Sequence, residues 1–187
     1  MKIAVLGWGS LIWNPGTLAI VDGFQSGGPQ LAVEFSRVSK DGRLTLVIDE
    51  TAGTACQTYY ALSSLETLEA AAGNLQSREK TNTNGVGFID LRTEKRAAAT
   101  ASRHGKSGEV IRNWAGEKGF DAVIWTALVS NFHEAGKGGE PFTVDAALRY
   151  LRKLDKVRFD LAIEYIRNAP LEVQSPVRAA TSKSWPT

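Results

Sequence analysis

The feature that most constrains the fold is a helix-breaking triplet placed shortly behind a glycine pair. Residues 2–6 predict a short buried strand, and the chain then enters the loop Gly7-Trp-Gly-Ser10. The triplet Asn14-Pro15-Gly16 follows and is a strong turn signal. A doubly wound α/β fold needs a helix directly after its first strand, and the triplet stops such a helix before it completes a turn. We therefore do not expect this chain to open with a strand–helix–strand unit.

The order of the remaining elements favours an α+β fold. Strands are expected at 31–38, 44–48, 54–62, 85–91 and 121–129, and the alanine run 97–101 is expected to extend or pair with a strand. Helices are expected from Ser63 to about residue 75, around Val110 and ending at Gly119, from Thr143, and from about Asp155 to Asn168. Asp41-Gly42 predicts a hairpin between the first two of these strands, and the tail after Pro170 has no obvious periodicity. Because long strand–helix alternation is missing, we expect a compact, mostly antiparallel sheet or β-barrel with flanking helices.

Composition limits the class of partner. The chain has 187 residues, which fits a single domain over 1–187 whose last part, from about 143, is helical. Its net charge of +2 is too small to favour nucleic acid as a partner. No apolar stretch is long enough to cross a membrane, and the segment before Gly7 is too short for a signal peptide, so we expect a cytoplasmic protein. Cys56 is the only cysteine, and its place in a strand predicts a buried thiol.

The glycine pair raises the question of a nucleotide site. Gly7 and Gly9 fit the start of a G-x-G-x-x-G fingerprint, but Ile12 stands at the third glycine position. Without a helix behind the loop there is no helix dipole and no row of free amides for a pyrophosphate. A dinucleotide site is therefore the least favoured of the functions weighed for this loop.

A single carboxylate is a better match to the loop. Because glycine adopts positive φ, the N–H groups of Gly9, Ser10 and Leu11 can turn toward one point and hold a small anion. The alternative is a tight turn that only packs Trp8 and Trp13 into the core. Spacing alone favours the packing turn and leaves the anion site as the alternative.

A family resemblance bears on that choice. The segment Gly7-Trp-Gly-Ser-Leu-Ile-Trp13 resembles the GYGSLIW signature of the γ-glutamylcyclotransferase-like superfamily, in particular its ChaC-type branch. Phe35-Ser-Arg-Val-Ser39 followed by Leu44-Thr-Leu-Val47 looks like the family's R-x-S segment and its next strand. Leu75-Gln-Ser-Arg-Glu-Lys80 looks like the segment that carries the family's catalytic glutamate. Together these matches cover roughly the first 90 residues.

The resemblance implies a fold and an activity. It implies a mixed β-barrel with helices outside, and cyclisation of a small γ-glutamyl compound to 5-oxoproline with release of an amine and without a cofactor or metal. Such chemistry belongs to glutathione metabolism and is an amide-cleaving intramolecular acyl transfer. One departure is Trp8, which stands where the family signature has tyrosine. That departure motivates a second hypothesis, a non-catalytic binding or regulatory module that uses the same cavity.

The candidate catalytic residue is Glu79. A carboxylate between the α-amine and the departing nitrogen can act as base and then as acid, provided burial raises its pKa. If the segment is extended, Glu79 faces the cavity while Arg78 and Lys80 remain in solvent; the alternative is an ordinary charged helix end. The loop residues Gly7, Trp8, Gly9, Ser10 and Leu11 are expected to bind the substrate, with the α-carboxylate on the amides from Gly9 to Leu11. Arg37 is expected either to pair with a substrate carboxylate or to face solvent.

Other catalytic arrangements find little support. His104 and His133 are expected at the surface, and neither has a third ligand at metal-binding spacing. Ser10 lies in no nucleophile-elbow pattern, and nothing near Cys56 indicates an activated thiol.

Overall fold

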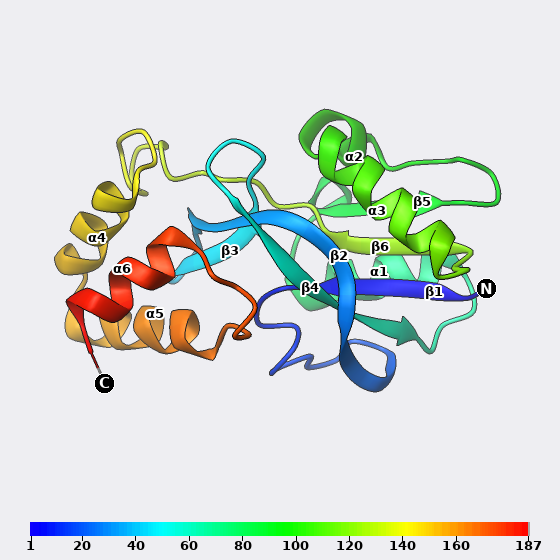
Figure 1. The fold of residues 1–187 in the computed structure, drawn as a ribbon, viewed down its shortest axis with the longest axis horizontal. Helices are drawn as coiled ribbons and strands as arrows, with labels where there is room; N and C mark the ends of the chain where they lie inside the picture. The colour runs from blue at the N-terminus through cyan, green and yellow to red at the C-terminus, as the bar shows by residue number, and fades with distance from the viewer. Residues whose placement is uncertain (187) are drawn as a thin grey trace. The chain divides into compact units, whose positions relative to one another are not determined.

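The computed structural model describes residues 1–186 and has an α+β fold (Figure 1). The elements are β1 (Ile3–Gly7), β2 (Ile20–Val38), β3 (Leu44–Ile48), β4 (Thr54–Ser63), α1 (Leu68–Glu79), the 3-10 helix η1 (Thr83–Gly85), β5 (Val86–Asp90), α2 (Ala98–Arg103), α3 (Gly105–Glu117), β6 (Ala122–Thr126), α4 (Val144–Lys153), α5 (Lys156–Asn168) and α6 (Pro176–Ser184). None of the described helices combines the length and the apolar character that crossing a bilayer requires.

The strands form one six-stranded sheet in the order β3-β2-β4-β1-β6-β5. Strand β1 pairs antiparallel with β4 and parallel with β6, while β2–β3 and β5–β6 are antiparallel. The expected α+β class and mostly antiparallel sheet are confirmed. Within residues 1–186 the two outermost strands of this order do not pair with each other, so the sheet is open rather than a closed barrel.

The chain forms two compact units, and neither is one continuous segment. The first unit comprises Met1–Leu31 and Gln57–Leu128, and the second comprises Ala32–Cys56 and the described residues from Val129 onward. Strands β2 and β4 each contribute residues to both units. All the predicted site residues except Arg37 belong to the first unit.

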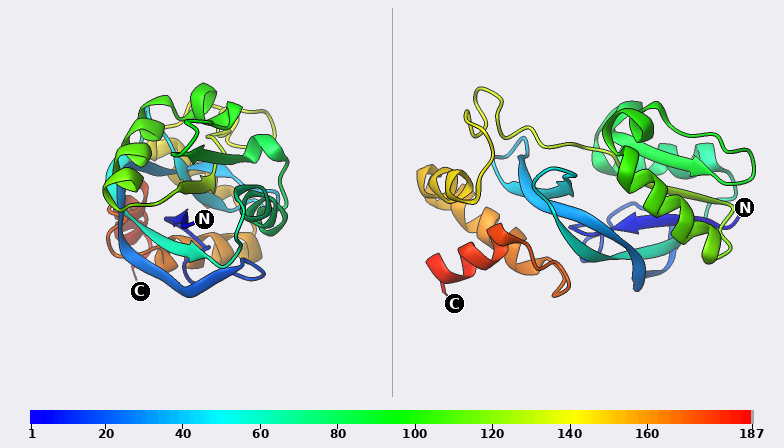
Figure 2. Two further views of the ribbon diagram at one scale, coloured as in Figure 1. Left: turned by 90° about the vertical axis from the view of Figure 1, so that its right-hand side faces the viewer. Right: turned by 45° about the horizontal axis from the view of Figure 1, so that its top comes forward.

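In the first unit, helices cover both faces of the strands. Helix α1 lies on one face, where it packs on a buried apolar cluster that includes Leu75 of the helix, Val5 of β1 and Ile124 of β6. Helices α2 and α3 lie on the other face, so that β5 and β6 run between them and α1 (Figure 2). The side chain of Trp125 points to this second face, where its indole Nε1–H donates to Nδ1 of His104 (3.2 Å).

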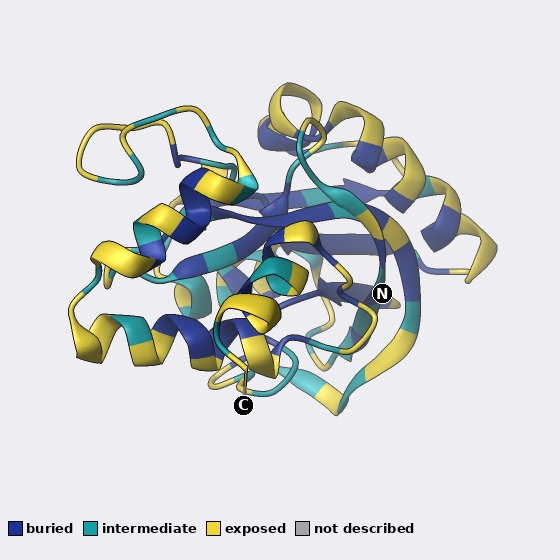
Figure 3. Cartoon of the chain, turned by 60° about the vertical axis from the view of Figure 1, so that its left-hand side comes forward, coloured by how far each residue is buried: buried dark blue, intermediate teal, exposed yellow. Residues whose placement is uncertain are grey.

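In the second unit, three helices pack with β3 and the end of β2. Helices α4 and α5 are each buried along one side and exposed along the other (Figure 3), as amphipathic helices are. Helix α6 is fixed by Glu34, a fully buried carboxylate of β2 that accepts from the Ser175 hydroxyl (2.5 Å) and the Val177 N–H (3.3 Å). Ser175 also caps the helix, because its side chain accepts from the N–H of Arg178.

The predicted start of the first helix was wrong by several residues. Ser63 ends β4, and its hydroxyl accepts from the N–H of Leu65 (3.1 Å), so this side chain serves a local turn. Helix α1 begins at Leu68, where Thr67 is the N-cap and accepts from the N–H of Ala70 (3.2 Å).

Three further expectations were corrected. The alanine run lies in helix α2 and is not a strand. The pairing with β5 is limited to an isolated bridge between Ile89 and Arg96, just before the run. The tail, which showed no periodicity, contains α6. Strand β2 begins at Ile20 rather than 31, and it extends through positive-φ glycines at Gly23 and Gly27 that weaken a sequence signal for a strand.

Candidate functional site

The glycine loop forms a single helical turn at the end of β1. The N–H of Ile12 donates to the Gly9 carbonyl (3.0 Å), and the N–H of Asn14 donates to the Ser10 carbonyl (2.8 Å). The N–H groups of Gly9, Ser10 and Leu11 donate to no other group among residues 1–186, as expected of the first amides of a helical turn. Three successive amides at one end of this turn therefore have no hydrogen-bond partner within the described residues.

The backbone conformation that leaves these amides without partners differs from the expected one. Gly7 and Gly9 do not have positive φ; in this loop only Gly16 does, at +60°. The right-handed turn itself leaves the amides without partners, so left-handed glycines are not needed. Gly7 provides space instead, because a Cβ there would lie 2.7 Å from the ring of Phe24 and would force that ring to shift.

The loop also packs into the core. Trp8 is buried, and Leu11 belongs to the apolar cluster beneath α1, while Ser10 is half-buried and Trp13 is partly buried. The same turn of chain therefore packs Trp8 into the core and leaves three amides without a partner among the described residues, so the two interpretations do not exclude each other.

Glu79 is the last residue of α1 and faces the sheet. Ala71, Leu75 and Glu79 are spaced four residues apart, which places them on one side of the helix, and the first two are buried in the apolar cluster. The Glu79 side chain is only 16% exposed. The carboxylate therefore extends an apolar row by one helical turn.

The segment around Glu79 is not extended, and Arg78 is not in solvent as we expected. The Arg78 side chain is 17% exposed, and its Nη1 lies 3.0 Å from Oε1 of Glu79. Its Nε donates to the Pro15 carbonyl (3.2 Å) and its Nη2 to the Asn14 carbonyl. One guanidinium thus joins the carboxylate of Glu79 to the end of the glycine loop.

Helix termination explains how both neighbours of Glu79 are placed. Lys80 is exposed and left-handed (φ 50°, ψ 43°), and its N–H donates to the Ser77 carbonyl (3.2 Å). The N–H of Thr81 donates to the Gln76 carbonyl (3.2 Å), which completes a Schellman motif. The chain turns away directly after Glu79, so Lys80 alone reaches solvent.

The pKa of Glu79 is raised above its ordinary value. The larger cause is burial, which disfavours the charged carboxylate, and the nearby Arg78 charge offsets part of this effect by lowering the pKa. A raised pKa is the direction expected of a carboxylate that acts as a general base.

Arg37 belongs to the second unit, where its Nη1 donates to the Val129 carbonyl (2.6 Å).

His133 is exposed as expected. His104 is not at the surface as we expected; it is 1% exposed, because it lies at the junction of α2 and α3 beneath Trp125. Within residues 1–186 no three His, Cys, Asp or Glu side chains gather in a way that would hold a metal ion.

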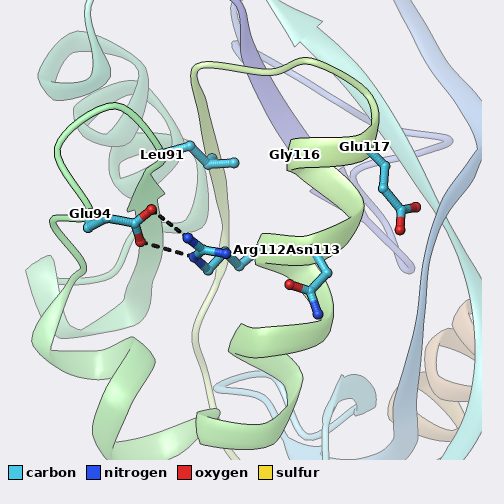
Figure 4. A pocket seen from close by; sticks show the side chains of 6 residues that line it. All are labelled: Leu91, Glu94, Arg112, Asn113, Gly116 and Glu117. Atoms are coloured by element: carbon cyan, nitrogen blue, oxygen red, sulfur yellow. Dashed lines mark hydrogen bonds and ion pairs between the residues drawn. The ribbon is translucent and has the colours of Figure 1, made fainter.

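A separate hollow of about 370 Å³ lies on the first unit (Figure 4). It is lined by Leu91, Glu94, Arg112, Asn113, Gly116 and Glu117. Arg112 is held there by Glu94, whose two oxygens accept at 2.6 and 3.0 Å, so its donors already have an anionic partner. None of the predicted site residues lines this hollow.

Comparison with known proteins adds no relative. No family model matches the chain, and no curated protein and no solved structure matches it either. The family resemblance therefore rests only on the three sequence segments that suggested it, namely the glycine loop, the stretch from Phe35 to Val47 and the α1 terminus.

Sequence reasoning missed the part played by Arg78. It treated the residue as a solvated neighbour of Glu79, whereas the guanidinium holds the loop and the carboxylate together. The signal was present in the basic residue of the last helical turn, which is favoured near carbonyl groups and here meets those of the loop.

Proposed function

We propose that this chain is a cofactor-free γ-glutamyl cyclotransferase-like enzyme that converts a small γ-glutamyl compound to 5-oxoproline and a free amine. The observation that carries the proposal is the guanidinium of Arg78, which joins the buried Glu79 carboxylate to the end of the loop that has free amides. The link to glutathione metabolism that the family resemblance implies belongs to the same proposal.

The loop amides fit the substrate's α-carboxylate. Three successive N–H groups from Gly9 to Leu11 and the adjacent Ser10 hydroxyl offer donors to one anion. Holding the α-carboxylate fixes the α-amine beside it, and cyclisation needs that amine about 3 Å from the γ-carbonyl carbon of the same molecule. Positioning thus provides much of the rate, and the protein must add proton transfer.

Glu79 fits the proton transfer. The neutral α-amine attacks the γ-carbonyl carbon, and the new ring nitrogen gives its extra proton to the carboxylate. The protonated Glu79 then gives that proton to the departing nitrogen, whose bond to carbon breaks as the carbonyl re-forms. Burial raises the pKa of Glu79 and so brings it closer to the pKa of the amine. The smaller difference favours proton transfer both to and from the carboxylate.

The test is 5-oxoproline release from a panel of γ-glutamyl amino acids, γ-glutamyl amines and glutathione. We expect turnover of at least one compound and a loss of at least about 100-fold in kcat for Glu79→Gln. Glu69→Gln is the matched control, since Glu69 is an exposed glutamate in the first turn of the same helix. No product from any compound overturns the proposal, and full activity of Glu79→Gln removes this residue from the mechanism.

The second candidate is a binding or regulatory module that uses the same amides. Trp8 favours it, because an indole replaces the phenol of the family signature and adds buried bulk at the start of the loop. Saturable binding of a γ-glutamyl compound by calorimetry without any product would support the module, and observed turnover would exclude it.

A further inference from the structure

Thr126 ends strand β6 at the same end of the sheet as the glycine loop. Strands β1 and β6 are parallel, with Val5 opposite Ile124, so both strands finish at one edge of the sheet. Strand β5 begins there, with Val86 opposite Thr126, directly after the turn that follows Glu79. Topology thus brings the loop, the α1 terminus and Thr126 together within the first unit.

Thr126 also lies on the α1 face of the sheet. Ala122 and Ile124 belong to the apolar cluster beneath α1, and side chains two residues apart share a face of a strand. Trp125 points to the opposite face, toward His104. Thr126 therefore continues the row of Ala122 and Ile124, as Glu79 continues the row of the helix that covers them.

The Thr126 hydroxyl has no protein partner. Its Oγ1 is buried and makes no hydrogen bond to any group among residues 1–186. The backbone beside it is fixed, because the N–H of Ala127 donates to the Gly85 carbonyl (2.8 Å) and Arg103 donates to the Ala127 carbonyl (3.1 Å). A buried hydroxyl without a partner costs about 1–3 kcal/mol, which the fold would avoid with valine at this position.

We infer that the Thr126 hydroxyl donates a hydrogen bond to the γ-carbonyl oxygen of a bound γ-glutamyl compound. The inference rests on the proposed function. That proposal places the substrate's α-carboxylate on the loop amides and assigns the proton transfers to Glu79, but it gives the substrate's γ-carbonyl oxygen no hydrogen-bond donor. When the α-amine attacks, the carbonyl electron pair moves to this oxygen, and it returns when the bond to the departing nitrogen breaks. A donor in place before the reaction stabilises that transient negative charge.

Two substitutions test the inference. Thr126→Val keeps the shape and removes the hydroxyl, and Thr126→Ser keeps the hydroxyl. We expect Thr126→Val to lower kcat by about 100-fold, the scale of losing one such donor, with little change in KM. We expect Thr126→Ser to keep most of the activity. Thermal unfolding should show Thr126→Val to be at least as stable as the wild type, because no protein hydrogen bond is lost.

The outcomes separate this inference from the proposal beneath it. Wild-type turnover with a kcat of Thr126→Val within about twofold of wild type overturns the inference alone. A clearly lowered melting temperature of Thr126→Val overturns it as well, since the hydroxyl then has a structural partner. No turnover by the wild type on the whole panel overturns the proposed function, and the inference with it.

Discussion

Replacing Lys80 by glycine tests how the helix end that carries Glu79 is built. Lys80 occupies the left-handed position of the Schellman motif, where glycine is the usual residue. A side chain in this conformation costs about 1–2 kcal/mol. Glycine removes that cost but loses about 0.5–1 kcal/mol through its greater freedom in the unfolded chain. The net gain of glycine over an L-residue without charge is thus about 0.5–1 kcal/mol.

The comparison that isolates this gain is Lys80→Gly against Lys80→Ala. Both variants lose the charge that a lysine places near the helix C-terminus, worth about 0.3–1 kcal/mol, and only glycine relieves the left-handed backbone. Urea unfolding followed by circular dichroism should give Lys80→Gly the higher midpoint at an unchanged m value. For a chain of this size the melting temperatures should differ by about 1–4 °C. Equal stability of the two variants, or a more stable Lys80→Ala, would refute the assigned backbone strain.

Two further predictions concern buried carboxylates. In Arg78→Met, the pKa of Glu79 should rise further because the positive charge that lowers it is gone, so the acid limb of the kcat–pH profile should move to higher pH; an unmoved limb would contradict the ion pair's effect. In Glu34→Ala, urea unfolding should show a loss of about 2–4 kcal/mol, because Ser175 and Val177 lose their buried acceptor. A loss under about 0.5 kcal/mol would show that Glu34 does not hold α6.

Several elements could be predicted because their signals are local. The hairpin at Asp41-Gly42, the N-cap of α4 at Thr143 and the N-cap of α5 at Asp155 depend on a few neighbouring residues, and the structure has them where expected. The predicted start of α1 was wrong because Ser63 and Thr67 both offer a capping hydroxyl. Strand β4 pairs with β1 as far as Leu62, so Ser63 is the last residue of the strand and cannot begin the helix. Helix α6 was missed because its position depends on Glu34, 141 residues away along the chain from Ser175.

By itself the sequence determined the α+β class, the absence of a helix after the first strand, and the choice of Glu79 and the glycine loop as candidates. These follow from hydrophobic period, turn residues and a family signature, which all act over short stretches of chain. Only the tertiary structure decided that the sheet stays open, that Arg78 joins the loop to Glu79, and that Thr126 lies on the α1 face. The physical reason is that burial and long-range hydrogen bonds arise when distant segments pack, and one residue's neighbours along the chain do not encode them.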